Sequence, residues 1–223
     1  MVDVGGSNDT AIKRTYTAAP PRPGGQPIDI AVLASGSGTN LQALIDDSRV
    51  RPHVAVVLSD RQHAQALQRA ADAGIATSVI RWQDHDDRNA FSSAVADVVE
   101  SHGAKGVVLA GFMRILAPSF VDRFPGRVLN IHPSLLPSFP GSHAVEAALE
   151  HGAKVTGVTV HIVDEKVDNG PIVAQVPVEI LPDDTVETLH ARIQVEEHRV
   201  YPEVVAAFVE GHLLVSGRKV TLQ

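Results

Sequence analysis

The sequence contains no cysteine. It therefore forms no disulfide, and it lacks both a thiol nucleophile and the thiolate ligands of structural zinc sites. It also contains no apolar run that approaches the about 20 residues of a membrane-spanning helix. The amino terminus has no apolar secretory core, so we expect a cytoplasmic protein without a membrane partner.

Basic residues are also few. Lys and Arg together number 19 against 26 Asp and Glu, which gives a formal net charge of −7. Nucleic-acid-binding proteins present a basic face, so this balance argues against a nucleic-acid partner. It leaves an anionic small molecule open, because a helix dipole or a single arginine can dominate a pocket.

Apolar residues make up 44% of the 223 residues, enough to build a full core and to exclude disorder for most of the chain. Residues 1–27 differ, because Gly, Pro, Thr and Ala occur there without periodicity. We predict a disordered tail or an expression remnant for this segment. No internal repeat or linker follows, which predicts one domain over residues 28–223.

Short apolar strands alternate with amphipathic helices up to residue 131. We predict strands at 28–33, 54–58, 77–80, 107–110 and 128–131, and helices at 41–47, 64–73, 88–101 and 118–124. Phe91, Val95 and Val99 show the helical spacing. This alternation is typical of a doubly wound, Rossmann-like α/β fold with a mostly parallel sheet.

The pattern changes after residue 141. We predict a helix at 143–151, antiparallel strands at 156–163 and 172–180 on one edge of the sheet, and short terminal strands around Leu213 and Val220. Asp184 to Glu187 resembles a helix-starting cap. The long helix that follows should run to about Glu210, and Pro202 should kink or restart it.

The end of the 128–131 strand is the first candidate site. Side chains alternate along a strand, so Asn130 and His132 project from one face, with Ile131 between them on the other. Three prolines and Gly141 then exclude regular structure up to residue 141. The amide and the imidazole predict a polar site. The alternative is a strand-end loop with two satisfied polar groups. A cis peptide before Pro137 fits so tight a loop.

Residues 36–40, Gly-Ser-Gly-Thr-Asn, form a glycine-rich turn between a strand and a helix. Converging backbone N–H groups and the helix dipole there suit a phosphate. A dinucleotide fingerprint would need a third glycine at Leu41, and only Asp60 supports that interpretation weakly. No Gly-Lys-Ser/Thr follows, which excludes an ATP loop. A single phosphomonoester fits best, and a tight turn without ligand is the alternative.

Two further loops could line a site. Residues 111–116 follow a strand at the carboxyl edge of the sheet, where α/β proteins bind ligands, and could hold a flat heterocycle or merely lead into a helix. In the acidic loop 164–171, Asp168 precedes a fold-back signal that could aim it at His132 and favour the imidazolium. A metal site from His132, His143, His161 and Asp168 is the weaker alternative, because the spacing matches no tight zinc pattern.

Taken together, these segments resemble the folate-dependent formyltransferases, and within them the enzymes of purine biosynthesis. The matching motifs are Ser-Gly-Ser-Gly-Thr-Asn-Leu-Gln (35–42), Leu-Ala-Gly-Phe-Met-Arg-Ile-Leu (109–116), Asn-Ile-His-Pro-Ser-Leu-Leu-Pro (130–137), Asp-Asn-Gly-Pro-Ile (168–172) and Gln-Val-Glu-Glu-His-Arg-Val-Tyr-Pro (194–202). They cover the chain from about residue 28 to its end. The extension over residues 1–27 departs from the compact pattern.

The resemblance implies direct attack of a glycinamide amine on the formyl carbon of 10-formyltetrahydrofolate. Asn130 and protonated His132 would donate to the developing oxyanion, and Asp168 would keep His132 charged and help to relay the amine proton. No covalent enzyme intermediate is implied. Ser134 as a nucleophile lacks the required elbow and triad order.

The resemblance also implies the binding residues. The glycinamide ribonucleotide would be held by Gly38, Thr39, Asn40, Gln194 and Glu197, and the folate by Arg88, Met113, Arg114, Ile115, Leu116 and Asn130. The alternatives are an exposed polar helix face for Gln194 and Glu197 and a surface charge for Arg88. The implied partners are these two small molecules, no metal is implied, and a homodimer is left open.

Three other functions fit part of the pattern. A formyltetrahydrofolate hydrolase should carry an additional N-terminal domain, and a transfer-RNA formyltransferase should carry a C-terminal nucleic-acid-binding domain. A non-catalytic phosphate-binding module predicts that Asn130, His132 and Asp168 do not converge. The positions of these three side chains separate that module from an enzyme.

Overall fold

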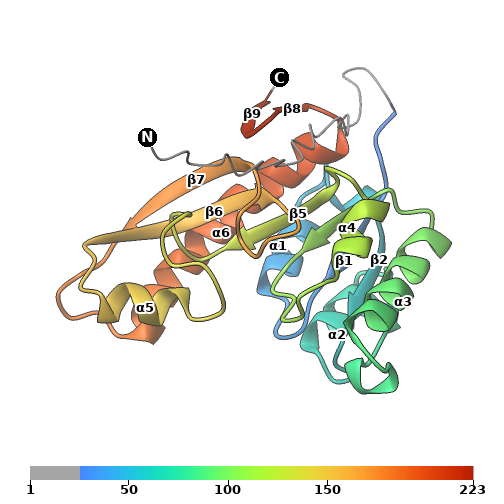
Figure 1. The fold of residues 1–223 in the computed structure, drawn as a ribbon, viewed down its shortest axis with the longest axis horizontal. Coiled ribbons are helices and arrows are strands. Elements are labelled where there is room, and N and C mark those ends of the chain that lie inside the picture. Colours follow the sequence, from blue (N-terminus) through green and yellow to red (C-terminus); the bar gives the residue numbers. More distant parts are fainter. Residues whose placement is uncertain (1–25, 223) are drawn as a thin grey trace, which may run out of the picture.

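The computed structural model describes residues 26–222, which form one nine-stranded sheet with helices on both faces (Figure 1). The predicted tail lies outside the described residues as far as residue 25. The strand order is β3-β2-β1-β4-β5-β6-β7-β9-β8. The strands are β1 (Ile30–Leu33), β2 (Val54–Ser59), β3 (Ala76–Val79), β4 (Gly106–Leu109), β5 (Val128–His132), β6 (Val155–Ile162), β7 (Ile172–Glu179), β8 (Leu213–Ser216) and β9 (Lys219–Leu222). The helices are α1 (Thr39–Asp46), α2 (Gln65–Asp72), α3 (Arg88–Ser101), α4 (Pro118–Arg123), α5 (Ala144–Glu150) and α6 (Val186–Val209).

Strands β1 to β5 form the parallel half of the sheet, as the sequence predicts. Alternate residues of β1 enter two separate cores. Ile30 and Val32 pack with residues of α1, α2 and α6, whereas Ala31 and Leu33 pack with residues of α3 and α4. Both faces of β1 and β4 are therefore buried, which is why their sequences are apolar at every position. Helix α1 begins at Thr39, two residues before the predicted start, because the glycine-rich turn is shorter than its sequence suggests.

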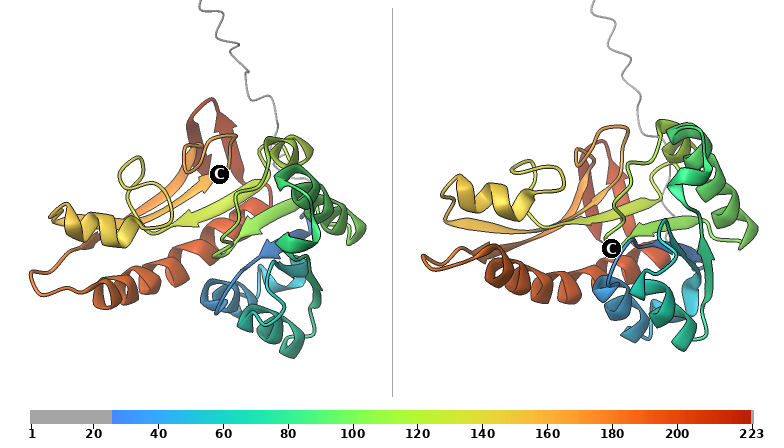
Figure 2. Two further views of the ribbon diagram at one scale, coloured as in Figure 1. Left: turned by 60° about the horizontal axis from the view of Figure 1, so that its bottom comes forward. Right: turned by 90° about the horizontal axis from the view of Figure 1, so that it is seen from below.

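Strands β6 and β7 extend the sheet in antiparallel fashion from β5. The prediction that they form an edge was wrong. The terminal hairpin of β8 and β9 joins β7 through a pair between Ile172 and Lys219. Among the described residues, β8 is therefore the edge strand at this end of the sheet, opposite β3. Figures 1 and 2 show this hairpin beyond β7, at the end of the sheet away from α2 and α3.

Helix α6 runs without interruption from Val186 to Val209, although Pro202 lies inside it. The expected restart at this proline was therefore wrong. Proline removes one backbone donor, but apolar residues on either side of Pro202 are buried in the core against the sheet, and that packing stabilises the helix. The helix cap was also misplaced by one residue. Thr185 accepts from the Thr188 amide and Thr188 returns a bond, so Thr185 rather than Asp184 is the cap.

Candidate active site

Asn130 and His132 lie on one face of β5, at its carboxyl end. Ile131 between them packs on the opposite face, with α6 and the core around it, as the alternation predicts. Asn130 is half-buried and His132 is 5% exposed. Two polar side chains thus emerge from a buried strand where its neighbour β4 has ended, because Leu109 and Asn130 are the last pair between the two strands.

Both ring nitrogens of His132 face hydrogen-bond acceptors. Nε2 is 2.9 Å from the carbonyl oxygen of Phe139, and Nδ1 is 3.5 Å from Oδ2 of Asp168. A neutral imidazole donates from one nitrogen only, whereas the imidazolium donates from both. In either state, the two acceptors fix the orientation of the His132 ring.

His161 joins these residues from the neighbouring strand β6, where it is the direct partner of Asn130 in the register. Its Nε2 lies 3.1 Å from the amide nitrogen of Asn130 and 3.6 Å from Oδ1 of Asp168. Its Nδ1 lies 3.2 Å from the carbonyl oxygen of Ile162. When Nδ1 carries the proton, Nε2 accepts from Asn130; when both are protonated, Nε2 donates toward Asp168.

Asp168 completes the group, with its carboxylate between the two histidines. It accepts a 2.8 Å hydrogen bond from the Gly141 amide. Burial raises the pKa of this carboxyl, but the hydrogen bonds from His161 and Gly141 and the charges of His132 and His161 together outweigh burial and leave the pKa below its ordinary value. Asp168 is thus held as a carboxylate beside His132.

The acidic loop reaches this position by an unusual backbone path. Asp168 has a positive φ of 51°, a conformation that Asp adopts more readily than most residues. At Gly170 a Cβ would lie 1.7 Å from the carbonyl oxygen of Ile162, so only glycine allows the loop to pass this close to β6. The fold-back signal in the sequence thus has a steric basis.

The proline loop is fixed by hydrogen bonds as well as by its prolines. Thr159 on β6 donates to the Ser134 carbonyl at 2.6 Å and accepts from the Leu136 amide at 3.0 Å. The hydroxyl of Ser134 donates to the Ser138 carbonyl at 2.5 Å, a structural role inside the loop. The peptide between Leu136 and Pro137 is cis, as predicted.

The glycine-rich turn leads directly into α1. Gly38 is its cap residue, with a φ of 70°, and no side chain caps the helix. A Cβ on Gly38 would lie 2.7 Å from Ala66 of α2, so the turn and α2 pack too closely for any other residue. The uncapped N–H groups and the helix dipole remain available to a phosphate.

Asn40 and Glu197 lie on opposite elements and pair with each other. The amide nitrogen of Asn40 donates to Oε2 of Glu197 at 2.9 Å, and both side chains are buried. The Oδ1 atom of Asn40 is buried without a hydrogen-bond partner among the described residues. Gln194 lies one turn earlier on α6, half-buried. The predicted ribonucleotide residues are thus gathered around the α1 start and the middle of α6.

The 111–116 loop lies at the carboxyl end of β4. Met113 and Ile115 are 59% and 56% exposed, unusual for side chains of their size. Ser35 accepts from the Met113 amide at 2.9 Å, which ties this loop to the glycine-rich turn. Arg114 donates to Asp60 at 2.7 Å and lies over the Trp82 ring. Asp60 is thereby engaged by an arginine, which argues against the dinucleotide-binding interpretation that Asp60 weakly supported.

Arg88 makes contacts with the 111–116 loop that the sequence did not predict. Its guanidinium donates to the carbonyl oxygens of Ile115 (3.0 Å) and Leu116. It therefore fixes the end of the 111–116 loop from the start of α3. A direct pair with a carboxylate would use its remaining donors.

The strongest omission from the sequence analysis is His161 as a partner of Asn130. The only available signal was the antiparallel pairing of 156–163 with the preceding strand, whose register the sequence did not give. The four-residue metal alternative does not hold together, because the His143 side chain is 82% exposed beside Glu146.

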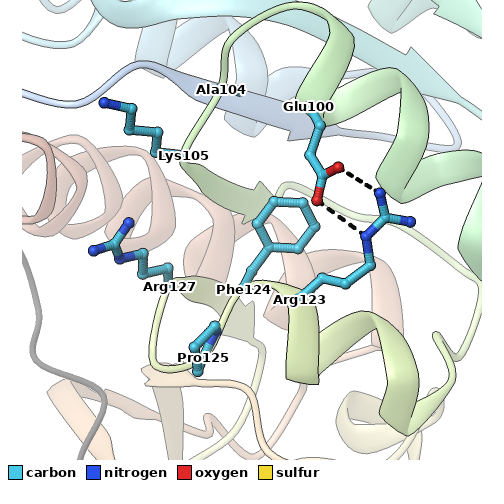
Figure 3. A pocket seen from close by; sticks show the side chains of 7 residues that line it. All are labelled: Glu100, Ala104, Lys105, Arg123, Phe124, Pro125 and Arg127. Carbon is cyan, nitrogen blue, oxygen red and sulfur yellow. Dashed lines mark hydrogen bonds and ion pairs between the residues drawn. The ribbon is translucent and has the colours of Figure 1, made fainter.

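A surface cavity lies at the amino ends of β4 and β5, away from these residues. Figure 3 shows Lys105 and Arg127 on one side of it, and Arg123 paired with Glu100 on the other. Its volume is about 510 Å³ and Phe124 and Pro125 contribute its apolar surface. None of the predicted site residues lines it.

Comparison with known proteins agrees with this geometry. The formyl transferase family model matches residues 28–205. A phosphoribosylglycinamide formyltransferase of Mycobacterium tuberculosis is 46% identical over 90% of this chain and 96% of its own length, and that of Escherichia coli is 42% identical over 83% and 89%. The crystal structure of glycinamide ribonucleotide transformylase 1 from Symbiobacterium toebii superposes with a TM-score of 0.85, at 49% identity, over 88% of this chain and 94% of that one. The chain described here belongs to the formyl transferase family.

Proposed function

We propose that this chain transfers the formyl group of 10-formyltetrahydrofolate to the amine of 5-phosphoribosylglycinamide in purine biosynthesis. It is an enzyme of the kind that its relatives' names state, a phosphoribosylglycinamide formyltransferase. The observation that carries the proposal is the convergence of these side chains: the Asp168 carboxylate lies 3.5 Å from His132 and 3.6 Å from His161, and His161 lies 3.1 Å from the Asn130 amide. The non-catalytic module predicts no such convergence.

The reaction forms one C–N bond and breaks another. The glycinamide nitrogen bonds to the formyl carbon, the bond from that carbon to N10 of the folate breaks, and the proton that the amine loses ends on N10. Negative charge develops on the formyl oxygen between these events. The site must therefore supply donors to that oxygen and a route for one proton.

Asn130 and His132 are the donors. His161 orients the Asn130 amide, and the Phe139 carbonyl and Asp168 orient the His132 ring. In the bound state the formyl oxygen replaces the Phe139 carbonyl as the acceptor for Nε2 of His132. Each well-aimed donor to an oxyanion contributes about 3 kcal/mol to transition-state stabilisation in other enzymes.

Asp168 supports the charged form of His132 and relays the amine proton through water. Its lowered pKa keeps it ionised at neutral pH, so it favours the imidazolium and can accept a proton from the attacking amine. Because the Gly141 amide also donates to it, the proline loop and the acidic loop hold the carboxylate together.

The phosphate of the ribonucleotide binds at the α1 start, against the N–H groups that Gly38 and Thr39 present. The unpartnered Oδ1 of Asn40 and the carboxylate of Glu197 are acceptors beside it, suited to ribose hydroxyls. Gln194 borders the same place. These residues fit a phosphorylated sugar better than a bare anion, because acceptors stand next to the anion site.

The folate binds along the 111–116 loop. The exposed Met113 and Ile115 side chains offer apolar contact to a flat ring, and Arg114 and the backbone offer polar contact at its edge. Arg88 holds the end of the loop and directs its remaining donors to the acidic tail of the folate. Asn130 is adjacent at the end of β5.

Incubation with 5-phosphoribosylglycinamide and 10-formyltetrahydrofolate, followed by folate absorbance, tests the function. We expect turnover that requires both substrates, and formylated glycinamide as the product by mass spectrometry. Consumption of the folate without the amine substrate would instead indicate the hydrolase, and no change in either substrate would overturn the enzyme assignment.

A further inference from the structure

Tyr201 is the largest fully buried side chain among the described residues. It lies in the middle of α6, with its ring in the core between that helix and the sheet. A buried phenol needs a hydrogen-bond partner, so the position of its hydroxyl is informative.

The hydroxyl of Tyr201 contacts two neighbouring strands at once. It donates to the carbonyl oxygen of Leu109 at 2.7 Å and lies 3.5 Å from that of Leu129. A carbonyl oxygen has two lone pairs, so it can accept the phenol in addition to a partner in the sheet. Burial, reinforced by the charge of Glu197, raises the pKa of Tyr201 well above its ordinary value, so the hydroxyl stays protonated and remains a donor.

These two carbonyls lie at or near the carboxyl ends of β4 and β5, just before segments of the proposed site. Leu109 is the last residue of β4 and precedes the 111–116 loop, and Leu129 directly precedes Asn130. Leu109 and Asn130 are also the last registered pair between β4 and β5. The hydroxyl therefore bonds at the point where the two strands separate around the site.

The same face of α6 also contacts the proposed ribonucleotide site. Glu197 lies one turn before Tyr201 and accepts from Asn40 at the start of α1. One rigid helix thus contacts the α1 start through Glu197 and the ends of β4 and β5 through Tyr201. The two substrates must meet between these elements for the amine to reach the formyl carbon.

We propose that Tyr201 is a positioning residue for formyl transfer, which sets the β4 and β5 ends, and with them Asn130 and the 111–116 loop, relative to the α1 start. The inference rests on the proposed function. The phenol touches neither substrate, and its effect passes through the backbone of Leu109 and Leu129. Loss of the hydroxyl loosens the alignment of the reacting groups more than the affinity of either substrate.

Tyr201→Phe removes the hydroxyl and keeps the ring. We expect kcat to fall about tenfold, since small misplacement of reacting groups has large effects on rate, with the KM of each substrate changed less than twofold. Phe208→Leu is the matched control. Phe208 is equally buried on α6, but its ring lies close to Gly106 at the amino end of β4. We expect this control to lower the thermal midpoint at least as much as Tyr201→Phe does, with kcat unchanged.

An unchanged kcat in Tyr201→Phe, or an equal loss of kcat in both variants, would overturn the inference. The proposed function would still stand, provided that the wild-type enzyme turns over. Absence of wild-type turnover would overturn both. A second measurement does not depend on the folding of the variant. The chain has two tyrosines, so fluorotyrosine labelling gives two ¹⁹F signals. We expect the Tyr201 signal to shift on addition of 10-formyltetrahydrofolate, and an unshifted signal would contradict the coupling.

Discussion

Polar residues lie beyond both ends of strands β4 and β5, and the two groups differ in kind. At the carboxyl end, His132 and His161 are buried, Asp168 is half-buried between them at 3.5 and 3.6 Å, and all three contact backbone groups. At the amino end, Arg123 pairs at the surface with Asp97 at 2.8 Å and with Glu100 at 2.5 Å (Figure 3). The amino end has the cavity, but the carboxyl end has the buried histidines and a carboxylate, Asp168, whose pKa its neighbours lower.

The comparison shows that the proposed site differs from the cavity in the burial and convergence of its polar groups. Surface ion pairs are screened by water and salt, so the loss of one partner changes the free energy of unfolding little. A buried histidine beside a carboxylate has few alternative partners, so its neighbours fix the orientation of its ring. Four predictions, ordered from the largest effect to the smallest, test this contrast.

His132→Ala should lower kcat about a thousandfold, because it removes a donor to the oxyanion and the group that Asp168 holds charged. KM for the ribonucleotide should change little, since the proposed phosphate site at the α1 start consists of other residues. Steady-state kinetics by folate absorbance measures both constants. His143→Ala is the control, because that histidine is exposed beside Glu146. Equal activity of the two variants would remove His132 from the mechanism.

Gly38→Ala should raise the KM for the ribonucleotide by about tenfold or more, because an added Cβ would lie 2.7 Å from Ala66 and displace the turn from the phosphate. Gly74→Ala is the matched control. Gly74 also has a positive φ of 75°, but open space surrounds it, so it has the same backbone strain without a clash. An unaltered KM in Gly38→Ala would move the phosphate elsewhere.

Asp168→Asn should change how stability depends on pH. The pKa of Asp168 is lower in the folded protein than in the unfolded chain, so its ionisation stabilises the fold above the unfolded value of about 3.9, and this contribution is lost as pH falls through the folded value. In urea unfolding, the gap in free energy of unfolding between wild type and variant should therefore be widest near pH 7 and narrow below about pH 4. A gap that widens in acid would contradict the assignment.

Arg123→Ala should have the smallest effect. It removes two exposed ion pairs at the amino end and should leave kcat and both KM values unchanged, with a thermal midpoint that falls slightly and less at high salt. Thermal denaturation at two salt concentrations and the folate assay measure this. A loss of activity comparable to that of His132→Ala would mean that the amino-end cavity takes part in the reaction.

The local sequence pattern was sufficient to predict where most helices and strands lie. Helix α3 begins and ends at the predicted residues, and the strands lie within two residues of their predicted bounds. The errors arose where distant parts of the chain compete with local preference. Pro202 does not interrupt α6, because the sheet packs against the residues around it. The hairpin of β8 and β9 took the edge position predicted for the 172–180 segment.

The site shows the same division. Alternation along one strand is a local property, so the shared face of Asn130 and His132 followed from the sequence. The partners of Arg88 and Asn40 did not follow, because these contacts join Arg88 to Ile115 and Asn40 to Glu197 across the fold. A side chain predicted to bind a ligand can also hold another segment of the proposed site in place.

The sequence by itself determined which side chains stand at the end of β5, that a glycine turn opens α1, and that the proline loop cannot be regular. These properties depend on backbone sterics within a few residues. Only the tertiary structure decided that His161 faces Asn130, that Asp168 lies between two histidines, and that the Tyr201 hydroxyl binds where β4 and β5 separate. Each of these depends on strand register or helix docking, which are set by packing between segments far apart in the chain.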